Sequence, residues 1–203
     1  MNRPELIRML DDLFHDITWS VTDVHKRAGD VVEGGYPYIA ASPIDQYNLF
    51  KYVSTLFRGR KLYTKDIKFL DCGCGLGLSM QIARKVGFDA YGLEYSPSMI
   101  KLGRSLSPYF YSRSFIKADI TTYKDYDKYD VIYYFRPLSD PKKQDEFEKY
   151  LENECKVGAY LICLYKQDKF SLSKDKRFKL IKIPRGGDWR RWSPQIWKKI
   201  KHS

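Results

Sequence analysis

Long hydrophobic runs, cysteine and histidine are all scarce in this chain of 203 residues. No stretch approaches the length of a membrane span, so we expect no membrane partner. The N-terminus lacks a basic region followed by an apolar run, and we therefore expect a cytoplasmic location. The three histidines, His15, His25 and His202, have no ligand spacing among them, and we assign them no chemistry.

The four cysteines lie at positions 72, 74, 155 and 163. No His or Cys pair has the spacing of a zinc site, so we expect reduced thiols and no metal. The hydrophobic fraction of 43% is ordinary for one globular domain. A chain of this length can bury a sizeable core without cross-links.

What the chain does have is an apolar strand that runs into three alternate glycines. The strand ends at Asp71, the turn contains Gly73, Gly75 and Gly77, and residues 78–86 read as a helix. Backbone without a Cβ allows a ligand to approach closely, and the free amides at a helix start can face that ligand. The pattern is typical of a nucleotide-type cradle, and taken alone it leaves a plain tight turn between a strand and a helix as the alternative.

The spacing of the glycines distinguishes between cofactors. A dinucleotide site needs a third glycine five residues after the first, but position 78 is Leu78. Asp71 precedes the first glycine, where a carboxylate repels a pyrophosphate and attracts a cation. A ligand with an ammonium or sulfonium group therefore fits better than NAD.

In these residues the chain resembles the class I S-adenosylmethionine (SAM) dependent methyltransferases, whose first motif is an acid, any residue and Gly-x-Gly-x-Gly. The resemblance covers about residues 67–166 and continues with Glu94 and Asp119 at the ends of the next two predicted strands. It implies that Glu94 accepts hydrogen bonds from the ribose hydroxyls, and that Asp119 and Ile120 bind the adenine. Taken alone, Glu94 can equally be a helix cap, and Asp119 can be one of several polar loop residues.

The cofactor-binding set that follows from the resemblance is Asp71, Gly73, Gly75, Gly77, Glu94, Tyr95, Asp119, Ile120, Phe135 and Tyr38. Tyr38 belongs to the Gly-rich loop 29–41. Members of the family often fold such a loop over the site as a lid, and the alternative is an ordinary connection.

Strands alternate with helices from residue 67 onward, which predicts an α/β fold with a Rossmann-like, mostly parallel sheet and helices on both faces. We expect strands near 67–71, 89–94, 114–118, 130–135 and 158–165, helices near 78–86, 97–106 and 141–154, and an edge strand at 179–183. The fold is trimmed, because about ten residues link the third and fourth strands, too few for a full helix.

Residues 1–60 are predicted to form an N-terminal helical cap and lid, with helices at 4–18 and 43–58, and residues 61–203 to form the SAM-binding core. Helix starts are further indicated by a capping residue followed by proline, at Ser42-Pro43, Ser96-Pro97, Asp140-Pro141 and Ser193-Pro194.

The net charge of +11 comes entirely from the last quarter of the chain. Residues 156–203 carry 14 Lys and Arg against three Asp, whereas residues 1–155 carry 22 residues of each sign. The interleaved aromatic residues are Phe170, Phe178, Trp189, Trp192 and Trp197. This composition predicts a surface for RNA or DNA over residues 166–201, with a solvated basic end as the alternative.

Methyl transfer mainly requires that donor and acceptor are held together in a dry pocket, so a strong base is often unnecessary. The family's substrate motif reads Tyr134-Phe135-Arg136-Pro137 here, which lacks the patterns typical of base-amine and cytosine-carbon enzymes. The catalytic residue is unknown, with Tyr134 and Arg136 as candidates. Arg136 either binds an anionic group of the acceptor or pairs with Asp130 or Asp140.

The function predicted from the sequence is that of a SAM-dependent methyltransferase acting on RNA or another nucleic acid. A protein lysine methyltransferase is the alternative, because the loop from Tyr38 to Pro43 and the helix after it precede the glycine motif, an order that resembles small lysine methyltransferases of this fold. The side chains available to line an entry for a lysine are Tyr36, Tyr38, Tyr133 and Tyr134. The third possibility is a non-catalytic SAM-binding partner subunit. The oligomeric state is left open.

Overall fold

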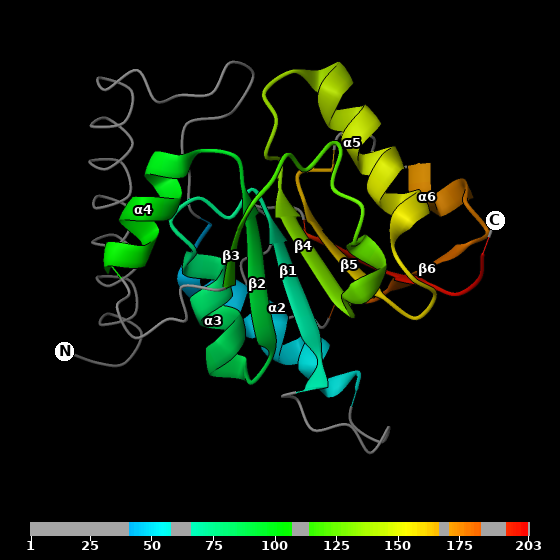
Figure 1. The fold of residues 1–203 in the computed structure, drawn as a ribbon. Helices are drawn as coiled ribbons and strands as arrows, with labels where there is room; N and C mark the ends of the chain where they lie inside the picture. Colours follow the sequence, from blue (N-terminus) through cyan, green and yellow to red (C-terminus); the bar gives the residue numbers. More distant parts are fainter. Residues whose placement is uncertain (1–40, 58–65, 107–113, 167–170, 184–193, 203) are drawn as a thin grey trace.

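The computed structural model of the chain describes residues 41–57, 66–106, 114–166, 171–183 and 194–202. Within them, seven strands form one sheet in the order β3-β2-β1-β4-β5-β7-β6 (Figure 1). The strands are β1 Lys68–Cys72, β2 Asp89–Glu94, β3 Phe115–Lys117, β4 Val131–Phe135, β5 Tyr160–Leu164, β6 Phe178–Ile181 and β7 Gln195–Lys199. Strands β1 to β5 pair in parallel, and β7 runs antiparallel to both β5 and β6. The predicted Rossmann-like, mostly parallel sheet is confirmed, and so is the edge position of β6.

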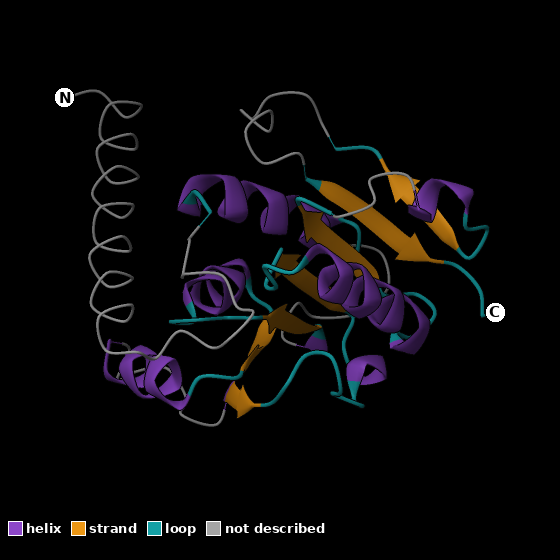
Figure 2. Ribbon diagram, turned by 90° about the horizontal axis from the view of Figure 1, so that it is seen from above, coloured by secondary structure: helices purple, strands orange, loops and turns teal. Residues whose placement is uncertain are grey.

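Helices cover both faces of the sheet (Figure 2). On one face, α2 (Pro43–Thr55), α3 (Leu78–Val86) and α4 (Pro97–Leu106) contribute apolar side chains to one buried cluster. On the other face, α5 (Pro141–Glu154), α6 (Ser171–Lys174) and the 3-10 turn η3 (Tyr126–Lys128) contribute to a second cluster. The η3 turn occupies the short link between β3 and β4, where the sequence predicted no full helix.

Helix α2 begins where the cap and proline predicted a start. The Ser42 hydroxyl accepts a hydrogen bond from the Asp45 N–H at 3.3 Å, and Pro43 lies in the first turn. Further along α2, the buried ring of Phe50 packs edge-on against Phe69 of β1, with 4.9 Å between ring centroids. Helix α2 therefore belongs to the layer of helices that packs against this face of the sheet.

The remainder of the predicted N-terminal cap lies outside the described residues, including the helix at 4–18 and the loop with Tyr38. The division of the chain at residue 60 stays a prediction.

The helix predicted to begin at Ser193-Pro194 is wrong, because the residues after Pro194 form β7. Ile196 faces the cluster beneath α2, and Trp197 faces the cluster beneath α5. This alternation fits a strand that is buried on both faces. Pairing with β5 on one side and β6 on the other satisfies the backbone of β7, which outweighs a local capping signal.

The basic end of the chain is less available to a polymer than the sequence predicted. Trp197 and Phe178 are buried in the core, so their predicted place on a surface for RNA or DNA is wrong. Lys199 is also buried, and its Nζ donates to the carbonyl oxygens of Glu152, Asn153 and Cys155 at 3.0, 2.8 and 2.8 Å. These carbonyls lie at the end of α5, where the helix leaves acceptors unpaired. Lys199 thus stabilises the fold.

Within the described ranges, no helix combines the length and the apolar character that crossing a lipid bilayer requires.

We expect the substitution Lys199→Met to lower the free energy of unfolding by about 2 to 4 kcal/mol, because three buried carbonyls lose their donor while the apolar stem is kept. Urea unfolding followed by circular dichroism measures this loss. Lys201→Met is the matched control, since Lys201 is exposed two residues further on. Equal stability of the two variants would contradict the capping role of Lys199.

Candidate functional site

The carboxyl ends of β1 and β4 lie where the strand order reverses. From β1 the chain proceeds outward through β2 to β3, and from β4 it proceeds the other way to β5. Ligands of open α/β sheets bind at such a point. The predicted site residues at the ends of β1, β2, β3 and β4 therefore lie along the same side of the sheet, where the parallel strands have their carboxyl ends.

The glycine turn after β1 has a left-handed backbone at all three glycines, with φ angles of 78° at Gly73, 52° at Gly75 and 81° at Gly77. Two of these positions are also crowded by the protein itself. A Cβ on Gly73 would lie 2.7 Å from the Cβ of Pro137, and a Cβ on Gly77 would lie 2.5 Å from the ring of Phe115. The fold therefore demands glycine at both positions, independently of any ligand.

Glu94 connects the glycine turn to the helix that follows β2. Its Oε2 accepts the Gly75 N–H at 2.9 Å, and its Oε1 accepts the Ser96 N–H at 2.9 Å. Glu94 thus holds the turn before α4, and the helix itself is capped by Ser96, whose hydroxyl accepts the Met99 N–H at 3.3 Å. Each carboxylate oxygen retains a second acceptor direction, so Glu94 can bind hydroxyl groups as well.

Among the acids at the carboxyl ends of the strands, Asp71 has a strongly raised pKa. Its side chain is 3% exposed, and a hydrogen bond with Ser79 of α3 partly compensates the burial. Burial raises the pKa of the Asp71 carboxyl to about 8, with the Ser79 bond opposing the shift and the charge of Glu94 adding to it. Without a cationic ligand, Asp71 therefore holds a proton near neutral pH.

Gln46 of α2 completes a polar cluster around Asp71. Its Nε2 donates to the Ser79 hydroxyl and to the Tyr133 hydroxyl, each at 3.0 Å. Tyr133 is the register partner of Asp71, so the two side chains leave the sheet on the same face.

The Oε1 of Gln46 is buried and has no hydrogen-bond partner in the described part of the chain. An amide oxygen and a carboxyl in one buried cluster provide acceptors for a group that donates several hydrogen bonds, and an ammonium is such a group. Sequence reasoning missed Gln46, whose only signal was a polar residue on the buried face of an amphipathic helix.

Other residues of the predicted cofactor-binding set, including Asp119 and Ile120 for the adenine, lie in different environments. Asp119 is exposed, and its Oδ1 accepts the Thr121 N–H at 2.8 Å and the Thr121 hydroxyl at 2.7 Å. Ile120 is buried in the cluster beneath α5. Tyr95 is 55% exposed beside Glu94. Tyr38 lies outside the described residues.

Tyr134 lies away from the other candidates. Its ring packs edge-on against Phe147 of α5, with 5.6 Å between centroids, and it is buried in the core. Burial raises the pKa of its phenol well above the ordinary value. This placement corrects the prediction of Tyr134 as a catalytic candidate, because the hydroxyl belongs to the core on the face opposite Asp71.

Two strained residues follow the neighbouring strands β4 and β5. Arg136 has a φ of 38° and Tyr165 a φ of 53°, values that non-glycine residues adopt rarely. The preceding ring of Phe135 stacks on Tyr165, with 5.8 Å between centroids. Backbone strain of this kind persists where the surrounding structure holds it, and it clusters at ligand sites.

Asp130 and Asp140, the alternative partners predicted for Arg136, contact other residues instead. Asp130 pairs with Lys156 at 2.7 Å. Asp140 caps α5 by accepting the N–H groups of Lys142 and Lys143. Among the described residues, no group of three or more His, Cys, Asp or Glu side chains is arranged to hold a metal ion.

Comparisons with known proteins agree with this architecture. A family described as "Methyltransferase domain" matches residues 63–200. A comparison with curated proteins found no match. Two similar solved structures are a ribosomal protein L11 methylase from Lactobacillus delbrueckii subsp. bulgaricus and an RNA methyltransferase from Salinibacter ruber in complex with S-adenosyl-L-homocysteine.

The L11 methylase is 15% identical, with a TM-score of 0.56 over 78% of this chain and 79% of that one. The RNA methyltransferase is 12% identical, with a TM-score of 0.55 over 82% of this chain and 96% of that one. Identities this low show the shared fold alone. In six further solved structures, among them the CcbJ methyltransferase from Streptomyces caelestis, the chain spans only about half of the other protein, 46% to 53%.

The raised pKa of Asp71 predicts a pH dependence of stability. Its folded value of about 8 lies above the ordinary 3.8, so the folded state binds the extra proton and loses stability as pH rises through that window. The stabilisation is complete below the ordinary pKa and is lost above the folded one. Asp71→Asn should flatten this part of the profile, as measured by thermal unfolding between about pH 5 and pH 9. Parallel stability profiles of the parent and the variant would contradict the raised pKa of Asp71 in the folded state.

Proposed function

The chain belongs to the methyltransferase domain family, and on this premise we propose that it binds SAM at the glycine turn and transfers the methyl group to RNA. The buried Asp71 carboxyl beside the glycine turn, at the point where the strand order reverses, is the observation that carries the proposal. When bound, SAM supplies an electrophilic methyl group on a sulfonium. The described residues fit that cofactor, because the buried and partnerless Gln46 Oε1 and the Asp71 carboxyl provide acceptors for its ammonium.

In this proposal each polar residue near the glycine turn has a distinct role. On SAM binding Asp71 would release its proton to solvent, and its carboxylate would accept hydrogen bonds from the ammonium, together with Gln46 Oε1. Glu94 holds Gly75 in place and accepts hydrogen bonds from the ribose hydroxyls with its remaining acceptor directions. Tyr95, exposed beside Glu94, offers a flat face to the adenine.

The loop after β4 forms the acceptor side of the site. Pro137 lies directly against Gly73, so this loop adjoins the turn that holds the donor. Arg136 can bind a phosphate of the acceptor. Orientation at attack distance supplies the rate enhancement, and no described group needs to act as a strong base.

The exposed lysines of the last quarter support RNA as the acceptor. Lys174, Lys176, Lys179, Lys182 and Lys201 are all exposed. Asp175, the single acid in the described part of this region, is engaged by Arg177 at 2.7 Å. The excess positive charge is therefore available to an anionic polymer, even though Lys166 and Lys199 are buried.

We expect tritium from methyl-labelled SAM to enter the RNA of a cell lysate, so that ribonuclease removes the label and protease does not. The control is Gly75→Arg, whose side chain occupies the space of the cofactor, with its fold checked by circular dichroism. Label that survives ribonuclease but not protease would favour a lysine methyltransferase instead. SAM binding without any transfer would favour a non-catalytic SAM-binding subunit.

Replacing Lys179, Lys182 and Lys201 together by Gln should weaken RNA binding most at low salt. If each lysine contacts one phosphate of single-stranded RNA, the slope of log affinity against log salt falls by about 2. The matched control replaces Lys51, Lys68 and Lys85, which are exposed in the first half of the chain. Fluorescence anisotropy measures these slopes. Equal salt slopes for the two triple variants would show that the basic end is a solvated surface without contact to RNA.

A further inference from the structure

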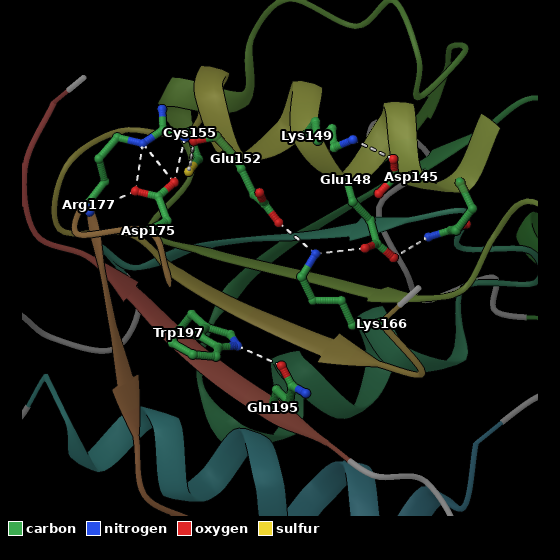
Figure 3. A network of polar contacts seen from close by, with 11 residues as sticks. Asp145, Glu148, Lys149, Glu152, Cys155, Lys166, Asp175, Arg177, Gln195 and Trp197 are labelled. Atoms are coloured by element: carbon green, nitrogen blue, oxygen red, sulfur yellow. Dashed lines mark hydrogen bonds and ion pairs between the residues drawn. The ribbon is translucent and has the colours of Figure 1, made fainter. Parts of the chain in front are cut away.

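A buried ion-pair network beneath α5 has no part in the chemistry proposed above (Figure 3). The Nζ of Lys166 lies 2.7 Å from Glu148 Oε2 and 2.7 Å from Glu152 Oε1. The three side chains are 2%, 1% and 8% exposed. Burial opposes the charge on Lys166, but the two carboxylates outweigh it and raise the pKa of the ammonium. Lys166 therefore remains charged inside the protein.

The network continues from Glu148 to the loop after β4. Glu148 Oε1 accepts a hydrogen bond from Gln144 Nε2 at 2.9 Å, and Gln144 Oε1 accepts the Leu138 N–H at 3.0 Å. Lys166 follows β5 and Leu138 follows β4, so the network joins the ends of two neighbouring strands. We call the chain of contacts through Lys166, Glu148, Gln144 and Leu138 the α5 relay.

Each contact of the α5 relay fixes the direction of the next. A carboxylate only accepts hydrogen bonds, so Gln144 must turn its amide nitrogen toward Glu148. Its oxygen is then left for the Leu138 N–H. Lys166 holds Glu148 in place, because its ammonium only donates and Glu148 Oε2 accepts at 2.7 Å.

Stability alone does not explain a buried ion pair at this place. Desolvation of the charges offsets their attraction, and apolar side chains of similar volume often give equal or greater stability. The relay does have a definite geometric effect, since it anchors the segment that contains Arg136 and Pro137. Pro137 touches the glycine turn, so a shift of this segment changes the distance between the donor and acceptor sides.

We propose that Lys166, Glu148 and Gln144 are positioning residues that hold the 136–139 loop against the glycine turn and thereby set the alignment of the acceptor. The acceptor role of the loop rests on the function proposed above. The hold on the loop rests only on the hydrogen bonds and the ion pair of the α5 relay, and the two parts are tested separately.

Amide hydrogen exchange at Leu138 tests the hold on the loop. Gln144→Leu removes the acceptor of the Leu138 N–H directly, and Lys166→Met acts on it indirectly, through Glu148. Both variants should speed exchange of the Leu138 amide by about tenfold or more, while peptides from β4 stay protected. Asp145→Ala is the control, because Asp145 lies next to Gln144 but pairs with the exposed Lys149. Parent-like exchange at Leu138 in Lys166→Met would overturn the relay.

A rescue variant separates positioning from loss of packing. In the background of Lys166→Met, the further changes Glu148→Gln and Glu152→Gln remove both uncompensated carboxylates and leave an amide oxygen at 148 that can accept from Gln144. We expect this triple variant to slow Leu138 exchange again, toward the parent value. No recovery would show that the side chain of Lys166 acts through packing, which also overturns the relay.

Kinetics with tritiated SAM and total RNA test the alignment. Gln144→Leu and Lys166→Met should lower kcat by about tenfold or more while the SAM dissociation constant, measured by calorimetry, changes by less than about threefold. Unchanged kcat with faster Leu138 exchange would overturn the effect on the acceptor. If the parent transfers no label to any lysate fraction, the proposed function fails, and the exchange data still decide whether the relay holds the loop.

Discussion

The parallel pairing of β1 with β4 is the constraint on which the rest of the structure depends. Its register sets Asp71 opposite Tyr133, so both side chains leave the sheet toward α2 and α3. The helices that cover this face bury the carboxyl and bring Gln46 and Ser79 to it. The same pairing brings Pro137, after β4, against Gly73, after β1. A slip of one residue in the register would move Asp71 to the other face and dismantle all of these contacts.

Much of the fold could be predicted from the sequence, because the patterns that indicate it are local. Alternate glycines, a cap followed by proline and the alternation of strands with helices all act within a few residues, and the predicted bounds of α3, α4 and α5 match the structure. The family predicted from Asp71 and the glycines is confirmed by the match over residues 63–200. Its fold is confirmed by the sheet order and by the similarity to the L11 methylase.

The errors concern contacts between distant parts of the chain. Lys199 and Lys166 read as surface charges in the sequence, yet one caps the end of α5 and the other neutralises two of its acids. Gln46 lies more than 20 residues before the glycine turn, and no local pattern assigns it to the Asp71 cluster. β7 was mistaken for a helix because a Ser-Pro pair is a local signal, whereas burial between two strands is decided by tertiary structure.

The position of β7 also has a consequence for how the chain folds during synthesis. Among the strands that the structure describes, β7 comes last in the sequence, but in the sheet it lies between β5 and β6. Until residues 195–199 leave the ribosome, β5 has an open edge of unpaired backbone groups, and every residue of that strand is buried in the finished fold. Open apolar edges pair readily with other chains. A nascent chain that stalls before Gln195 therefore presents a strand edge that other chains can pair with.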